Sequence, residues 1–161
     1  MIGMSEKKRT DVFCRIVNGD LPAAILWEDK EFIALLDQLP NTLGMTLVIT
    51  KKHYDSYAFD MPNDVYARLM LASKKTARML EKGLGVHRVA MVMEGLGVNH
   101  IHIKLYPLHG LKHKYHMKGS RKVGFYKNYI GYLVTHVGPW AKQADLQKLA
   151  AKIKRRSRAV S

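Results

Sequence analysis

The chain has 161 residues, of which 47% are hydrophobic and 25% charged, and its formal net charge is +14. This length suits one domain with a sizeable core, and the composition is that of an ordinary globular protein. No apolar run approaches the roughly 18 residues of a membrane span, and segment 1–9 is charged, unlike a signal peptide. The single cysteine, Cys14, excludes an intrachain disulfide, so we expect a reducing compartment, the cytoplasm.

The first half of the chain predicts one short helix followed by three strands. The helix covers residues 12–18 and ends at Gly19, ahead of Pro22. The strands are expected at residues 25–28, 31–36 and 45–50, with a tight turn at 29–30 and a second turn or loop at 40–41.

Apolar residues then recur at helical spacing from residue 64 to residue 80, with Asn63 able to cap the start and Gly83 able to close the end. Strands are expected at residues 88–93 and 98–105. About five mostly antiparallel strands with two helices make an α+β sheet domain.

The C-terminal part is less regular and strongly basic. A basic loop is expected at residues 108–124, a further strand at 130–135 and a helix at 145–156. Residues 104–161 hold 14 Lys and Arg against one acid, whereas residues 1–103 hold 13 against 12. A field of this size attracts polyanions, although a solvated tail has the same composition.

Polar and branched apolar side chains alternate from His100 to Lys104, which is the pattern of a half-buried strand. On such a strand His100, His102 and Lys104 project from one face about 7 Å apart, and the intervening residues point into a core. Two histidines and a lysine on one face favour the chemistry of anions.

Residues 97–107, with the sequence GVNHIHIKLYP, resemble the signature strand of the histidine triad (HIT) superfamily. Residues 12–22 resemble that family's opening helix and turn, and residues 34–37 with 47–53 resemble its central hairpin. The resemblance covers roughly residues 10–108 and implies the HIT-like fold. It leaves 1–9 as a mobile N-terminus and 109–161 as a basic extension that covers the sheet edge, shapes the site or joins a dimer.

HIT proteins are nucleotide hydrolases and nucleotidyl transferases, so the resemblance implies that His102 attacks an α-phosphate and carries the nucleotide as a phosphoramidate. His100 would orient its neighbours or fix the imidazole tautomer of His102. Lys104 replaces the family's third histidine. Its ammonium stabilises phosphate charge, but with an ordinary pKa of about 10.4 it donates a proton poorly near neutral pH. We therefore expect slow turnover or an unusual leaving group.

The nucleotide pocket is also implied by the resemblance. Asp37 matches the acidic residue at the ribose hydroxyls, and Gly95, Gly97 and Val98 precede the signature strand, where main-chain N–H groups can approach a phosphate. A tight connection between strands would need the same glycines. Positions that line the base pocket, or that simply fill a core, are Val12, Phe13, Ile16, Leu21, Leu35 and Leu47.

Some HIT proteins hold structural zinc, and the matching positions here are Asp11, Cys14, His53 and His100. A carboxylate can replace a thiolate in a tetrahedral site. Because Asp11 stands where those proteins have a cysteine, the sequence favours a protein that needs no cofactor and has no metal.

Three functions follow as hypotheses. The first is a hydrolase or transferase acting on a purine nucleotide, with a nucleoside phosphoramidate, a dinucleoside polyphosphate or an adenylylated adduct as substrate. The second is a nucleotide-binding sensor that has lost turnover, since Met45, Met93 and Lys104 stand where the family has polar residues or histidine. The third is a nucleic-acid-associated module that uses the basic extension. A homodimer is the family expectation, and no membrane partner is expected.

Overall fold

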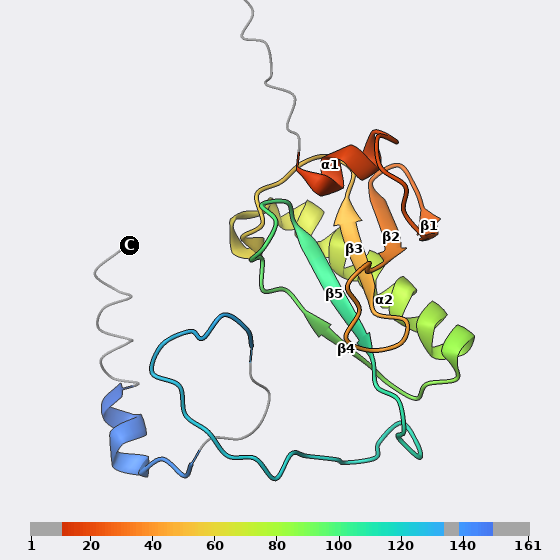
Figure 1. Cartoon of the computed structure of the whole chain (residues 1–161). Coiled ribbons are helices and arrows are strands. Elements are labelled where there is room, and N and C mark those ends of the chain that lie inside the picture. Colours follow the sequence, from red (N-terminus) through yellow and green to blue (C-terminus); the bar gives the residue numbers. More distant parts are fainter. Residues whose placement is uncertain (1–10, 134–138, 150–161) are drawn as a thin grey trace, which may run out of the picture. The chain divides into compact units, whose positions relative to one another are not determined.

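The structure, a computed structural model, describes residues 11–133 and 139–149 (Figure 1). The expected mobile segment 1–9 lies outside these residues. The chain divides after His116 into two compact units. No helix in the described part of the chain is long and apolar enough to cross a bilayer.

The first unit is built on a five-stranded antiparallel sheet in the order β1-β2-β3-β5-β4, which confirms the predicted α+β class. Its elements are α1 (Val12–Val17), β1 (Ile25–Glu28), β2 (Phe32–Leu36), β3 (Thr46–Thr50), the 3-10 helix η1 (Ala58–Asp60), α2 (Asn63–Leu84), β4 (Val89–Val92) and β5 (His102–Pro107).

Helix α2 runs across one face of the sheet (Figure 1). The alternate residues of β5 that point toward it, Ile103 and Leu105, are fully buried, as the strand pattern predicts. The other face carries a smaller apolar cluster under α1, with Phe13 from the helix and pairs of side chains from β2 and β3. The polar residues of β5 therefore face this smaller cluster, on the opposite side from α2.

Two predicted ends of α2 are wrong. Asn63 is already helical and caps nothing with its side chain, because Pro62 precedes the first turn. The helix passes Gly83 and ends at Gly85, which has a left-handed φ of 66°. Because the helix continues past Gly83, Leu84 packs against the core. This burial favours Gly85 over Gly83 as the C-cap.

Strand β5 begins at His102, four residues later than predicted, so His100 precedes the strand. The neighbouring strands explain the difference. β3 pairs with β5 only as far as Ile49 opposite His102, and β4 reaches only Val92 opposite Lys104. Residues 98–101 therefore lack a ladder partner, although Ile101 N–H still donates to the carbonyl of Tyr54 at 2.9 Å.

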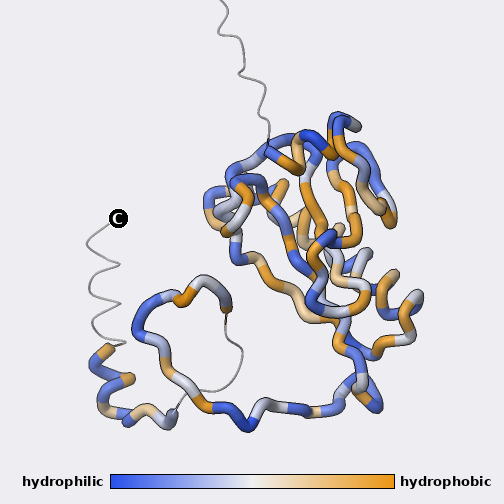
Figure 2. Tube along the Cα trace, in the orientation of Figure 1, coloured by the Kyte–Doolittle hydropathy of each residue, from blue (hydrophilic) through white to orange (hydrophobic). Residues whose placement is uncertain are grey.

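The second unit has little regular structure in its described residues. A helix covers residues 143–149, and the rest of the helix predicted to reach 156 lies outside the described residues. The strand predicted at 130–135 is wrong for residues 130–133, and its last two positions are not described. Figure 2 shows hydrophobic residues running along the strands of the first unit, whereas beyond residue 116 they are isolated among hydrophilic ones.

Candidate functional site

His102 opens β5 and is only 3% exposed. Its Nδ1–H donates to the main-chain carbonyl of His100 at 2.7 Å. A carbonyl only accepts hydrogen bonds, so this contact assigns the proton to Nδ1 and leaves the lone pair on Nε2. Among the described residues Nε2 has no hydrogen-bond partner. The ring thus presents an unprotonated nitrogen that is held in place from its far side.

Burial lowers the pKa of His102, and the positive charge of Lys104 and the neighbouring His100 lower it further. The hydrogen bond to the His100 carbonyl and the carboxylate of Asp37 act in the opposite direction but do not offset burial. Neutral imidazole, the nucleophilic form, is therefore favoured at this position.

An apolar wall lies beside His102. The ring of Phe13 is 5.3 Å from the His102 ring, and Ile49 and Leu47 of β3 pair with His102 and Lys104 respectively. The structure brings five of the predicted pocket residues into this one cluster: Phe13, Ile16, Leu35, Leu47 and Val98.

Two residues predicted for the pocket lie outside this cluster, and two members of the cluster were not predicted. Val12 is 40% exposed and Leu21 lies outside the cluster. Ile33 and Ile49 belong to the wall, each two positions along a strand from a residue that was predicted. Strand periodicity alone would have found them.

Lys104 lies on the same face as His102, and its Nζ is 3.7 Å from a carboxylate oxygen of Glu94. Both side chains are largely buried, and the carboxylate of Glu94 partly compensates the positive charge of Lys104. Glu94 was not predicted, although it directly precedes the glycine loop. Tyr106 shares the face of Lys104, and burial, followed by the carboxylates of Asp37 and Glu94, raises its pKa. The sequence predicted Lys104 as a site residue. It predicted neither Glu94, which contacts Lys104, nor Tyr106, which lies on the same face of β5.

Asp37 follows β2 at the edge of this face. Its main-chain N–H donates to the carbonyl of Met45 at 2.9 Å, and Oδ1 accepts from the N–H of Leu39 at 2.8 Å. Met45 is buried and Met93 is packed against the core, so both of these departures from the family serve as apolar packing.

The two glycines before β5 differ in their surroundings. Gly95 has a φ of 74°, and a Cβ there would lie 2.5 Å from the carbonyl oxygen of Ser56. Close packing of two main chains therefore accounts for Gly95. Gly97 has a φ of 93° and open space around it, so only its backbone conformation calls for glycine.

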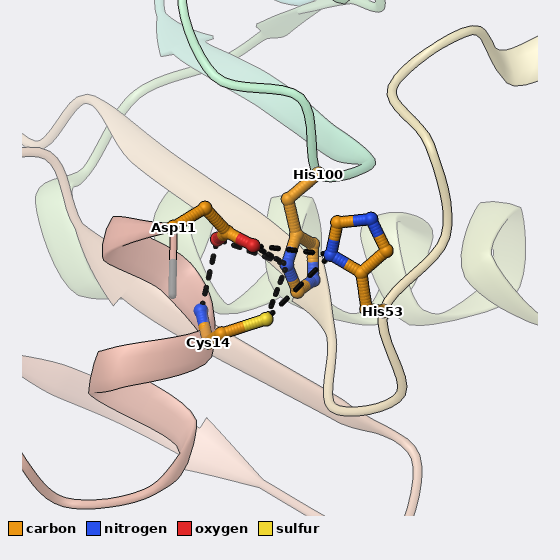
Figure 3. A group of neighbouring side chains, drawn as sticks. All are labelled: Asp11, Cys14, His53 and His100. Atoms are coloured by element: carbon orange, nitrogen blue, oxygen red, sulfur yellow. Dashed lines mark hydrogen bonds and ion pairs between the residues drawn. The ribbon is translucent and has the colours of Figure 1, made fainter. Parts of the chain in front are cut away.

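Four side chains converge at the start of α1 (Figure 3). Asp11 is the N-cap of α1, Cys14 lies in its first turn, His53 follows β3, and His100 precedes β5. One ligand atom from each of these residues lies within 4.8 Å of all the others. These are the four positions that the zinc-binding resemblance implies.

Four separations between donor atoms are close to those of a tetrahedral metal site. The Cys14 sulfur is 3.6 Å from Nδ1 of His53 and 3.5 Å from Nδ1 of His100. Asp11 Oδ2 is 3.0 and 3.4 Å from the same two nitrogens. Zinc bonds of about 2.3 Å to sulfur and about 2.0 Å to nitrogen or oxygen give tetrahedral edges of about 3.5 and 3.3 Å.

The outer ring nitrogens orient both histidines toward this centre. Nε2–H of His100 donates to the carbonyl of Thr50 at 2.8 Å, and Nε2 of His53 lies 3.3 Å from a carboxylate oxygen of Asp55. The Thr50 carbonyl assigns a proton to Nε2 of His100, so its Nδ1 lone pair faces the carboxylate of Asp11, whereas His53 has a carboxylate at each ring nitrogen and can donate to either. The Asp11 carboxylate and Nδ1 of His100 are both acceptors at 3.2 Å, and a cation or an additional proton between them stabilises this contact.

The carboxyl group of Asp11 is strongly biased toward its ionised form. Burial by itself raises its pKa, but hydrogen bonds from the Cys14 side chain and main chain outweigh this, together with the charge of His100 and the contact with His53. The net effect holds the pKa of Asp11 well below its usual range. Burial lowers the pKa of His100, which favours a neutral, ligating ring.

Known proteins are similar to this chain over much of its first unit. The family model described as the HIT domain matches residues 18–110. An uncharacterized HIT-like protein of Methanocaldococcus jannaschii is 38% identical over 101 residues, which are 60% of this chain and 77% of that protein.

Two solved structures extend the comparison. A zinc-bound histidine triad family protein of Mycobacterium smegmatis aligns with a TM-score of 0.55 at 33% identity, covering 68% of this chain and 84% of that one. A HIT family hydrolase of Legionella pneumophila aligns with a TM-score of 0.51 at 29% identity, covering 60% and 91%.

Proposed function

This chain belongs to the HIT family, whose members are generally hydrolases that bind nucleotides, and on that premise we propose that it transfers a nucleotidyl group through His102. One observation carries the proposal: the hydrogen bond from Nδ1–H of His102 to the His100 carbonyl leaves Nε2 unprotonated beside an apolar wall. The wall would hold the base, and Asp37 would accept hydrogen bonds from the ribose hydroxyls.

The proposed reaction has two displacements. Nε2 of His102 attacks the α-phosphorus and forms a P–N bond, while the bond to the leaving group breaks and its electron pair departs with that group. Water, or another acceptor, then attacks the same phosphorus, and the nitrogen of His102 leaves with its pair restored. Lys104 would offset charge on the departing group, and the nearby Glu94 moderates how strongly it does so.

We propose a purine nucleotide as the substrate, because an apolar wall suits a base. A leaving group that needs little protonation suits a site with lysine at the third position. The phosphate leaving group of a dinucleoside polyphosphate and the acidic leaving group of an adenylylated adduct meet this condition, whereas the amine of a nucleoside phosphoramidate must be protonated and should therefore leave more slowly. The weaker alternative is a sensor that binds the nucleotide without turnover.

An intact-mass measurement separates the two. The protein is mixed with adenosine 5′-phosphoramidate or a diadenosine polyphosphate, quenched in acid-free denaturant and weighed. We expect an AMP adduct in the wild type and none in His102→Ala, with the exposed His87→Ala as the matched control. Binding of AMP with neither adduct nor turnover would favour the sensor.

We also propose that Asp11, Cys14, His53 and His100 hold a structural zinc ion. The sequence favours no metal because a carboxylate replaces a thiolate, whereas the convergence and spacing of the four donors support the opposite preference. A bound zinc would tie α1 to the ends of β3 and β5 and contribute folding free energy. Elemental analysis of protein purified without chelator tests this proposal.

A homodimer is proposed at the β4 edge of the sheet. This edge strand leaves main-chain groups available for pairing, and a groove beside it exposes apolar side chains. The groove is lined by residues that include Met70, Leu71, Ala77, Val89, Met91 and Leu105. Light scattering should report a dimer for the wild type and for Met79→Lys, and a monomer for Met91→Lys, since both methionines are 45% exposed but only Met91 lines the groove.

A second function, nucleic-acid binding, is proposed for the extension. Phe125, Tyr132 and Trp140 are 79%, 62% and 102% exposed, Lys127 lies between the first two, and Lys122 and Lys142 flank the three in the sequence. Exposed aromatic rings among cations suit stacking on bases and pairing with phosphates. The observation that would remove this proposal is a failure to bind single-stranded oligonucleotide even at low salt.

A further inference from the structure

The cluster of four potential ligands and the nucleophilic histidine are joined through His100. The side chain of His100 directs Nδ1 into the cluster, 3.5 Å from the sulfur of Cys14. The main-chain carbonyl of the same residue accepts the hydrogen bond from Nδ1–H of His102. A shift of the His100 ring that moved its backbone would therefore move the group that orients His102.

Helix α1 forms a second connection. Phe13 lies between the two cluster residues of this helix, and its ring is 5.7 Å from the His100 ring and 5.3 Å from the His102 ring. With an exposed fraction of 6%, Phe13 is part of the apolar wall. The position of α1 therefore determines where Phe13 lies, both in the apolar wall and against the ring of His102.

Asp11 controls the place of α1. Its Oδ1 accepts hydrogen bonds from the main-chain N–H groups of Phe13 and Cys14, at 2.9 and 3.0 Å. Its Oδ2 lies 3.0 Å from Nδ1 of His53, inside the cluster. The carboxylate therefore caps the helix through Oδ1 and faces the cluster with both oxygens, since Oδ1 also lies 3.2 Å from Nδ1 of His100. A cysteine at this position would offer a stronger metal ligand but no comparable N-cap.

We propose that Asp11 is a positioning residue that couples metal occupancy of the cluster to the location of His102 and Phe13. When the cluster is filled, the carboxylate is held by the metal and by the helix N-terminus together. When it is empty, the carboxylate accepts a hydrogen bond from Nδ1–H of His53 in place of the metal bond, and this change of contacts displaces α1 or turns the His100 ring. The coupling deepens the proposed function, because it makes the nucleotide site depend on the metal without contact between them.

The test compares variants that separate the two tasks of Asp11. Asp11→Asn keeps a good N-cap but loses the anionic ligand. Asp11→Cys keeps a ligand but loses the cap. Asp29→Asn is the matched control, because Asp29 Oδ1 caps a turn with two main-chain bonds of 2.8 Å, to Glu31 and Phe32, far from any cluster.

Two measurements are made on the full chain, before and after zinc is stripped by chelation and then restored. The first is the ¹⁵N spectrum of the histidine rings, with His102 assigned by its absence in His102→Ala. The second is the affinity for AMP. The spectrum reports on the nucleophile without any nucleotide, so it decides the coupling even if AMP does not bind. Failure to bind AMP would count only against the proposed nucleotide function.

In the wild type and Asp29→Asn, stripping zinc should shift the His102 signals and weaken AMP binding about tenfold, the scale on which groups behind a ligand act. Zinc should restore both. Asp11→Asn should resemble the stripped wild type and respond little to zinc, and Asp11→Cys should bind zinc yet keep a displaced His102 signal.

Unchanged His102 signals on stripping, or a wild type that binds no zinc, would overturn the coupling. Global unfolding, seen as collapse of the His87 signal, would overturn it too, because the metal would then support the whole fold.

Discussion

The main-chain carbonyl of His100 accepts a hydrogen bond from Nδ1–H of His102 at 2.7 Å, while the His100 side chain belongs to a cluster of four potential metal ligands. Neighbouring histidines of one strand-like segment thus serve different centres. The first supports the second with its backbone, and loss of the first imidazole leaves this carbonyl in place but removes a ligand from the cluster. Substitution of His102 should therefore remove the nucleophile, whereas substitution of His100 should act on His102 only through the coupling proposed above.

The first prediction concerns the nucleophile. Replacing His102 by Ala should remove the AMP adduct and lower turnover of a nucleoside phosphoramidate about 10³-fold or more, because no other group at that position can attack phosphorus. Steady-state rates and intact mass measure this. Wild-type turnover in His102→Ala would contradict the mechanism, and His87→Ala should match the wild type in both assays.

The second prediction concerns Lys104. Lys104→Ala should impair turnover at low and at high salt, because its charge acts at short range on a largely buried face and is screened little. Lys104→His restores the family's third histidine and should keep or raise the rate. Glu94→Gln removes a negative charge beside the lysine and should strengthen AMP binding. If Lys104→Ala has the turnover of the wild type, Lys104 has no role in the reaction and its ion pair with Glu94 serves only the structure.

Zinc occupancy gives the third prediction. Purified protein should contain about one zinc per chain, and His53→Ala and Cys14→Ser should lose it. At a free zinc concentration 100 times its dissociation constant, the metal adds about 2.7 kcal/mol to the free energy of unfolding, which raises Tm by about 10–20 °C. Calorimetry with and without chelator measures the shift. A Tm that does not respond to chelator would argue against a bound metal.

The fourth prediction uses two glycines that differ only in their surroundings. Alanine at Gly97 should lower the free energy of unfolding by about 1–2 kcal/mol, the cost of its positive φ alone. Alanine at Gly95 should cost more, because its Cβ also meets the Ser56 carbonyl at 2.5 Å. Urea denaturation of the two variants gives the comparison. Equal losses would mean that the Ser56 main chain yields freely.

The fifth prediction concerns the basic extension. Removing residues 152–161 deletes five basic side chains and should weaken oligonucleotide binding at low salt while leaving AMP binding unchanged. Exposed charges act at long range, and their attraction fades beyond about 8 Å in physiological salt. Replacing Phe125 and Trp140 by Ala should weaken binding at every salt concentration if their rings stack on bases. If the truncated protein binds the oligonucleotide with the same salt dependence as the full chain, the oligonucleotide does not bind to residues 152–161.

Local patterns were sufficient for the sheet and for the two sides of β5. Side-chain alternation identified Ile103 and Leu105 as core residues and His102 and Lys104 as residues of the opposite face, because strand periodicity is a property of the chain alone. The resemblance to the HIT family also named the four cluster residues. Local patterns did not decide whether α2 ends at Gly83 or at Gly85, because Leu84 reaches the core only if the helix continues past Gly83.

Only the tertiary structure decided how these residues act together. His100 leaves the strand because neither neighbouring strand extends far enough to pair with it, and this frees its ring to join Asp11, Cys14 and His53. The proposal of a bound metal rests on the same convergence, which the sequence alone does not show. Composition counts ligands, whereas a metal site depends on lone pairs that converge at about 3.3–3.5 Å, and this convergence is set by packing between segments distant in sequence.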